Sequence, residues 1–270
     1  MYFLHTLTAA SAVCLDGTPG AFYVQLSESG STAWQLYFEG GGWCYDLDEC
    51  SSRATGNMGS SAAYPSSTVN PDFLNVTGGI VSSDCAINPT FCDFNKVYLK
   101  YCDGNSFAGA RDGAVDVVPS GDCGVSPLYF RGHEILKESL GALTPQMVAA
   151  TEVHVTGCSA GGLAAYLHAD LLGQWAEESL PAVAKFGVSP VSGFFLEHAT
   201  VMGPEHSVYP SQMQNVFLMQ NASRGLNQAC IAHCTVLVEP QLRRSSRPPN
   251  NSRFAPSLPP SLALSLSFVR

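Results

Sequence analysis

The sequence predicts a three-layer α/β fold built around a mostly parallel central sheet. Apolar runs alternate with turns rich in Gly, Asp, Asn and Ser as far as Cys234, in the rhythm of strands and helices. Such alternation is typical of parallel strands covered by helices. The 270 residues, 46% of them hydrophobic and 13% charged, are enough for one domain with one core. This composition excludes a coiled coil and disorder along the whole chain.

The predicted strands are rich in aromatic and β-branched residues, and each of them ends at a turn. In chain order they are residues 34–39, 96–101, 152–156 and 184–189. A first helix is predicted over residues 129–143, where four apolar side chains share one face: Ile135, Leu136, Leu140 and Leu143. An Ala- and Leu-rich helix follows the third strand as far as Trp175, and a further helix is predicted over residues 211–219.

The third predicted strand leads directly into Gly157-Cys158-Ser159-Ala160-Gly161 and then into a helix. This is the strand, turn and helix context of a nucleophile elbow, in which a serine projects its hydroxyl above the edge of the sheet. The G-x-S-x-G pattern alone occurs by chance in about one chain in four of this length, so the context carries the interpretation. Cys158 precedes the apex and would point into the sheet, which disfavours a thiol nucleophile. We therefore predict Ser159 as the nucleophile of an ester hydrolase.

A glycine triplet follows the first predicted strand, in the segment from Glu39 to Trp43. Backbone amides in a glycine-rich turn can stabilise the oxyanion of a tetrahedral intermediate without reorganisation. We expect the amides of Gly41, Gly42 and Ala160 to form this oxyanion hole. A flexible turn is the simpler alternative, and a phosphate loop is disfavoured because no G-K-[ST] follows. Trp43 adjoins the loop and is the candidate for contact with substrate.

Ten cysteines are spread along the chain without any C-x-x-C pair, at positions 14, 44, 50, 85, 92, 102, 123, 158, 230 and 234. Their even number and dispersion, with N-x-[ST] sequons at Asn75, Asn221 and Asn250, favour an oxidising, secretory compartment and several disulfides. A cytosolic protein with buried thiols is the alternative. Residues 1–12 end in Ala-Ser-Ala but carry no Lys or Arg, so they are a poor match to a signal peptide.

The charge balance and the hydropathy exclude two classes of partner. Thirteen Lys and Arg against 22 Asp and Glu give a net charge of 13 − 22 = −9, without a basic cluster, which disfavours nucleic acid. No apolar run reaches the roughly 18 residues that a membrane span requires.

Residues 235–270 contain six prolines, seven serines and five arginines but no aspartate, and we predict a disordered tail there. The foldable domain is therefore expected over residues 12–234.

Five segments together resemble the pectin acetylesterase/Notum family. In chain order they are AVCLDGTPGAFYV (12–24), YFEGGGWCYD (37–46), KYCDGNSFAG (100–109), GCSAGGLAAYLHAD (157–170) and SGFFLEH (192–198). The resemblance covers about residues 12–234. It implies an α/β-hydrolase-like fold and a secreted, disulfide-bonded serine carboxylesterase that removes acyl groups, such as acetate from pectin.

Carried over residue by residue, the resemblance implies that Ser159 is the nucleophile and that Gly41, Gly42 and Ala160 supply the oxyanion amides. Trp43 and Cys44 match positions beside the acyl pocket. The family's catalytic Asp and His lie in later segments that we do not find in this sequence. We therefore keep two hypotheses: an ester hydrolase that deacetylates an extracellular polysaccharide, and an inactive, incomplete family member that at most binds acylated glycans. We expect a monomer that requires no cofactor.

Other polar residues are expected to be structural. None of the histidines at 133, 154, 168, 198, 206 and 233 has a sequence position that predicts a base for Ser159. Asp170 and Glu197 are similarly expected to pack or cap. Three aspartates, Asp103, Asp112 and Asp116, lack the spacing of a calcium loop and predict turns. The group Cys230, His233 and Cys234 lacks a second pair at zinc spacing, so a disulfide is preferred and no metal site is predicted.

Overall fold

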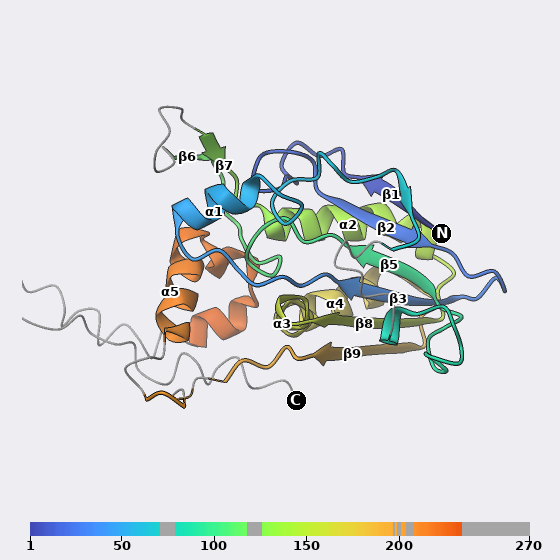
Figure 1. Ribbon diagram of the computed structural model, residues 1–270. Coiled ribbons are helices and arrows are strands. Elements are labelled where there is room, and N and C mark those ends of the chain that lie inside the picture. Colours follow the sequence, from blue (N-terminus) through green and yellow to red (C-terminus); the bar gives the residue numbers. More distant parts are fainter. Residues whose placement is uncertain (71–78, 118–125, 197, 199–200, 204–207, 234–270) are drawn as a thin grey trace, which may run out of the picture.

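The computed structural model describes residues 1–70, 79–117, 126–196, 198, 201–203 and 208–233 (Figure 1). Its centre is a seven-stranded sheet in the order β4-β1-β2-β5-β3-β8-β9. The strands are β1 (Tyr2–Thr6), β2 (Ala21–Gln25), β3 (Ala33–Phe38), β4 (Ser67–Thr68), β5 (Asn95–Leu99), β8 (Glu152–Cys158) and β9 (Lys185–Val191). A separate hairpin joins β6 (Val115–Val117) to β7 (Ser126–Leu128).

The sheet is mixed, and its parallel part is the part that the sequence predicted. β5, β3, β8 and β9 pair in parallel, and these are the four predicted strands, each displaced by one or two residues at its ends. β4, β1 and β2 extend the sheet with antiparallel pairs, and β2 joins β5 antiparallel. The α/β architecture is confirmed, with an antiparallel extension that the alternation of strands and helices did not reveal.

The helices are α1 (Leu47–Ala54), α2 (Gly132–Met147), α3 (Ala160–Leu167), α4 (Ala169–Ser179) and α5 (Tyr209–Met219), with short 3-10 turns η1 (Gly79–Val81) and η3 (Ala222–Gly225). The single helix predicted after the elbow is two helices. They meet at His168, whose φ of −108° departs from helical geometry. The His168 ring at this junction is buried, with Nε2 3.1 Å from the Ser106 carbonyl.

One face of the sheet carries the main core. Leu36 and Phe38 of β3 are fully buried there against α2, α3 and α4. The opposite face carries a smaller cluster of Tyr2, Tyr23 and Tyr98. Phe38 lies at the carboxyl end of β3, where Figure 1 shows α1 and α5 beyond the ends of the parallel strands. Catalytic side chains at this edge would therefore be held by the largest part of the core.

Three disulfides confirm the prediction of an oxidised framework: Cys14–Cys102, Cys44–Cys50 and Cys85–Cys92. The first joins segments 88 residues apart in the sequence. The second joins Cys44, directly after Trp43, to Cys50 within α1, six positions later in the sequence. Cys158 forms no disulfide within the described residues. Cys123, Cys234, the sequons at Asn75 and Asn250, and the predicted tail 235–270 lie outside the described residues.

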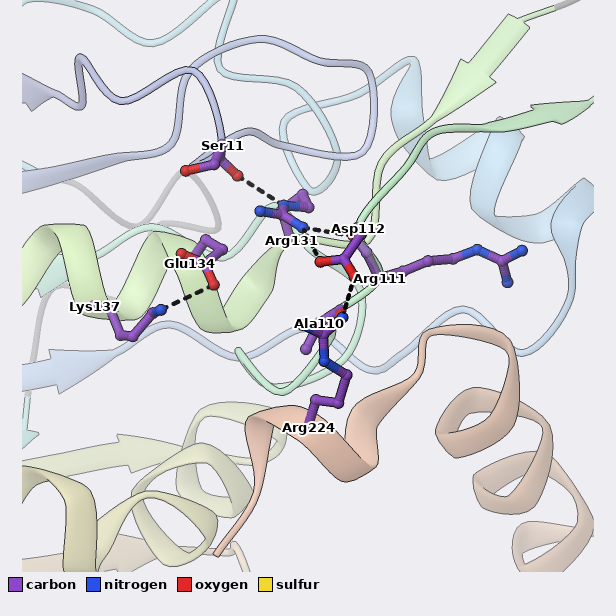
Figure 2. Close-up of polar contacts among 8 residues, drawn as sticks. All are labelled: Ser11, Ala110, Arg111, Asp112, Arg131, Glu134, Lys137 and Arg224. Atoms are coloured by element: carbon purple, nitrogen blue, oxygen red, sulfur yellow. Dashed lines mark hydrogen bonds and ion pairs between the residues drawn. The ribbon is translucent and has the colours of Figure 1, made fainter. Parts of the chain in front are cut away.

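Arginines tie the segment after Gly109 to its neighbours (Figure 2). Arg131 donates from Nε to the carbonyl of Ser11 at 3.0 Å and from Nη1 to the carbonyl of Arg111 at 2.7 Å. Asp112 accepts a hydrogen bond from Arg224 of η3 and lies 3.6 Å from the Arg131 guanidinium. The Arg224 contact lowers the pKa of Asp112. Asp112 is thus a structural residue, as predicted.

Edge strand β9 is mostly exposed, including Phe186 at 36% and Val191 at 41%. No helix in the described part of the chain combines the length and the apolar character that crossing a membrane requires.

Candidate active site

Ser159 stands at a sharp turn between β8 and α3. Its φ of 58° and ψ of −123° are far from helical geometry, although it is the residue before the first turn of α3. A non-glycine residue with positive φ is uncommon and, in a strand-to-helix turn, marks the strained conformation of a nucleophile elbow. The side chain is half-buried. The predicted elbow therefore has the expected backbone conformation.

Glycines allow the backbones around the elbow to approach closely. A Cβ on Gly161 would lie 2.1 Å from the carbonyl oxygen of Phe38, and a Cβ on Gly157 would lie 2.4 Å from that of Gly161. A Cβ on Gly40 would similarly lie 2.1 Å from the carbonyl oxygen of Cys158. The glycine triplet and the elbow thus pack backbone against backbone, because no side chain separates them.

The glycine triplet turns through two left-handed residues, Gly41 with φ of 148° and Gly42 with φ of 68°. Their carbonyl oxygens are held by side chains. Arg53 Nη1 donates to the Gly41 carbonyl at 2.9 Å, and Tyr101 Oη donates to the Gly42 carbonyl at 2.7 Å. The triplet is therefore a fixed turn beside the elbow and not a flexible connection.

Ser106 links the loop, the elbow helix and a buried histidine, and its role was not predicted. Its hydroxyl accepts a hydrogen bond from Trp43 Nε1 and donates to the Ala160 carbonyl, both at 2.8 Å. Its own carbonyl lies 3.1 Å from His168 Nε2. Ser106 belongs to segment 100–109, one of the five that carry the family resemblance, and this was the only sequence feature that marked it. Its partners Trp43 and Ala160 are 63 and 54 residues away in the sequence, so they could not be identified from the segment alone.

Trp43 is a wall of this region and not an exposed residue. It is 8% exposed, and its ring lies edge-on to Phe195 at 4.9 Å and to Tyr209 at 6.2 Å. The hydrogen bond to Ser106 fixes its orientation. The ring is thus fixed between Ser106 and the aromatic side chains of Phe195 and Tyr209.

Asp103 closes the turn that holds Ser106. The buried carboxyl accepts the backbone N–H of Asn105 at 3.2 Å and of Phe107 at 3.0 Å through Oδ2. Ser106 and Phe107 both have positive φ, at 49° and 60°, so these bonds stabilise a strained turn. Loss of solvation raises the pKa of Asp103 to about 7 despite these bonds. Asp103 therefore has the turn role that was predicted.

In the described part of the chain, no hydrogen bond or ion pair joins Ser159 to a histidine or a carboxylate. His168 is buried against the Ser106 carbonyl, and loss of solvation lowers its pKa to about 4. His154 stacks on Phe91 at 4.2 Å on the opposite face of the sheet. His133 has its ring 6.3 Å from that of His168.

The remaining polar residues that were considered as catalytic candidates have structural or surface positions where the structure describes them. Asp170 accepts a hydrogen bond from Asn227 at 2.6 Å, a structural contact. His198 and His233 are exposed. Glu197 and His206 lie outside the described residues. Among the residues that the structure describes, no group of three His, Cys, Asp or Glu side chains could hold a metal ion.

The opposite pKa shifts of Asp103 and His168 predict a masked pH dependence of stability. From pH 3.8 to about 7 the folded protein retains a proton on Asp103 that the unfolded chain loses, so this carboxyl lowers stability as pH rises. From pH 6.5 down to about 4 the unfolded chain protonates His168 and the folded protein does not, so this imidazole lowers stability as pH falls. The two effects oppose each other over the same range.

Removing either group by a single substitution should reveal the pH dependence that the other group causes. In Asp103→Asn, where only His168 remains, the free energy of unfolding should rise by about 2 kcal/mol as the pH increases from about 4.5 to 6.5, with a slope of up to 1.36 kcal/mol per pH unit. In His168→Gln, which can still donate to the Ser106 carbonyl, it should fall by a similar amount. Urea unfolding across this range measures both. Parallel profiles for the two variants would contradict the prediction.

Comparison with known proteins supplies relatives for this site. The profile of the family described as Pectinacetylesterase matches residues 1–240. Pectin acetylesterase 5 of Arabidopsis thaliana is 34% identical over 223 residues, which cover 82% of this chain and 48% of that protein. Pectin acetylesterase 11 of the same plant is 32% identical over 242 residues, covering 89% and 56%. The chain thus spans about half the length of these relatives.

Animal proteins are similar as well. The palmitoleoyl-protein carboxylesterase NOTUM of Mus musculus is 30% identical over 199 residues, 72% of this chain and 36% of that protein. The crystal structure of the Wnt deacylase Notum from Drosophila superposes with a TM-score of 0.70 at 25% sequence identity, covering 86% of this chain and 63% of that one.

Proposed function

Because the chain belongs to the pectinacetylesterase family, we propose that it is a carboxylic ester hydrolase that acts through an acyl-enzyme on Ser159. The observation that carries the proposal is the positive φ of Ser159 at a strand-to-helix turn, packed against a fixed glycine turn. The relatives are named pectin acetylesterases, and the substrate proposed here is an acetylated extracellular polysaccharide such as pectin. The three disulfides support secretion. A monomer remains the expectation.

In the proposed reaction the Ser159 hydroxyl attacks the ester carbonyl and releases its proton to water, and the negative charge moves to the carbonyl oxygen. The N–H groups of Gly41, Gly42 and Ala160 donate to this oxyanion. Collapse of the intermediate breaks the bond to the sugar oxygen, which takes a proton from water and leaves as an alcohol. A second water then hydrolyses the acyl-serine, which regenerates the Ser159 hydroxyl and releases acetic acid. Trp43 would form a wall of the acyl pocket with Phe195.

The second candidate function is binding of acylated glycans without turnover. It is favoured by one observation: among the described residues, no hydrogen bond or ion pair joins Ser159 to a histidine or a carboxylate. A serine without its base retains only about 10³- to 10⁴-fold acceleration, which comes from the oxyanion hole and substrate binding. We therefore expect slow hydrolysis from the chain as it stands.

The test compares hydrolysis of p-nitrophenyl acetate and release of acetate from acetylated pectin by the 270-residue chain and by Ser159→Ala. We expect the unsubstituted chain to be slow but several-fold faster than the variant. Ser139→Ala is the matched control, because this buried hydroxyl in α2 has no hydrogen-bond partner among the described residues and its loss should leave the rate unchanged.

Equal rates for the chain and Ser159→Ala would exclude the esterase for this chain. Retention of either protein on immobilised acetylated pectin would then favour the binding function.

A further inference from the structure

The residues of the glycine turn do not by themselves fix the orientation of the Gly41–Gly42 peptide. A peptide between two glycines meets little steric resistance to a change of orientation, because neither residue has a Cβ. If the Gly41–Gly42 peptide turned over, its carbonyl oxygen would take the place of its N–H. A carbonyl oxygen facing a developing oxyanion would repel it, whereas the N–H would stabilise it. The orientation of this one peptide therefore decides whether the turn can act as an oxyanion hole.

Arg53 holds this peptide by its carbonyl. Its Nη1 donates to the Gly41 oxygen at 2.9 Å, and its Nε donates to the Met58 carbonyl at 3.0 Å. The guanidinium also lies over the Tyr101 ring, 5.1 Å from its centroid. These contacts fix the planar group on three sides, which a lysine ammonium could not reproduce.

Helix α1 places the guanidinium there. Asp46 caps the helix by accepting the Glu49 N–H at 2.8 Å, and the Glu49 carboxylate accepts the N–H of Tyr45, the residue before the cap, at 2.9 Å. The Cys44–Cys50 disulfide joins α1 to the residue two positions after Gly42. Arg53 in the last turn is thus anchored to the same loop that it contacts.

We propose that Arg53 is a positioning residue that orients the Gly41–Gly42 peptide so that its N–H can serve the oxyanion at Ser159. The described peptide bonds are trans, so the Gly41 carbonyl and the Gly42 N–H point in opposite directions. A carbonyl directed at Arg53 directs the N–H away from it. Tyr101 acts in the same sense on the next peptide through the Gly42 carbonyl. The proposal rests on the proposed function and adds to it the residue that keeps the Gly42 N–H available to the oxyanion.

The kinetic test uses Arg53→Ala and Arg53→Lys in the full chain with p-nitrophenyl acetate. We expect kcat to fall about 10- to 100-fold with KM changed less than about threefold, below the roughly 10²- to 10³-fold cost of losing a donor outright. Millimolar methylguanidinium should restore part of the rate of Arg53→Ala, and methylammonium should not. Arg111→Ala is the matched control, since this arginine also donates to a carbonyl, that of Met219, away from the loop.

A second measurement does not require turnover. In protein labelled with ¹⁵N-glycine, the amide signals of Gly41 and Gly42 should shift or broaden in Arg53→Ala and Arg53→Lys and stay unchanged in Arg111→Ala. If the chain and Ser159→Ala hydrolyse ester equally, the proposed function fails, and the amide signals still test Arg53. If the chain is active and folded Arg53→Ala matches it in kcat and in both signals, the role of Arg53 is overturned and the esterase stands.

Discussion

Replacing Lys100 by methionine will lower the free energy of unfolding by about 3–5 kcal/mol, because it leaves a buried carboxylate without its cation. Lys100 is paired with Glu39, and their side chains are 1% and 4% exposed. The Lys100 ammonium also lies 5.0 Å from the centroid of the Tyr64 ring. The second oxygen of Glu39 accepts the Tyr101 N–H at 2.7 Å, so the carboxylate is held at the start of the glycine turn.

The double variant Glu39→Gln with Lys100→Met should recover most of the lost stability. It removes both charges and keeps an acceptor for the Tyr101 N–H. The control is Lys137→Met, which breaks the exposed pair with Glu134 and should change stability by no more than about 0.5 kcal/mol. Urea unfolding monitored by tryptophan fluorescence measures all three. A Lys100→Met protein as stable as Lys137→Met would show that the buried pair contributes little.

Replacing Gly161 by alanine should destabilise the protein by more than the 1–3 kcal/mol of ordinary overpacking. The new Cβ would lie 2.1 Å from the Phe38 oxygen and 2.8 Å from the Glu39 oxygen, and both are backbone atoms of the central sheet and glycine turn. The relief of this overlap requires α3 to move away from β3, which also displaces Ser159. We expect loss of soluble protein or a sharply lower Tm.

Gly141 provides the matched control for this substitution. It lies within α2, where a Cβ would meet nothing within 4 Å. Gly141→Ala should therefore stabilise the protein by about 0.5–1 kcal/mol through helix propensity and the entropy of the unfolded chain. Equal Tm values for the two alanine variants would contradict the close packing at the elbow.

The elbow was predictable because its pattern is local. A strand, a G-x-S-x-G turn and a helix follow one another in the sequence, and the glycine triplet directly follows a second recognisable strand. α1, whose only buried residue is Cys50, lacks the apolar pattern that indicates a helix. β1 has an apolar start, Tyr2-Phe3-Leu4, but it lies within the segment that was compared with a signal peptide.

The supports of the site could not be predicted, since they are contacts between a side chain and a distant backbone. Arg53 reaches Gly41, and Ser106 reaches Ala160 from 54 positions away. Neither residue type suggests such a partner. At the break between α3 and α4, the His168 ring likewise contacts a carbonyl, that of Ser106, supplied by another segment.

The short Cys44–Cys50 bond makes the placement of Arg53 depend on the oxidation state of the protein. Reduction would break the covalent link between α1 and the residue two positions after Gly42, and α1 would then hold Arg53 beside the Gly41 carbonyl only through the hydrogen bonds at its N-terminus. A thiol reductant should therefore loosen the glycine turn without touching Ser159.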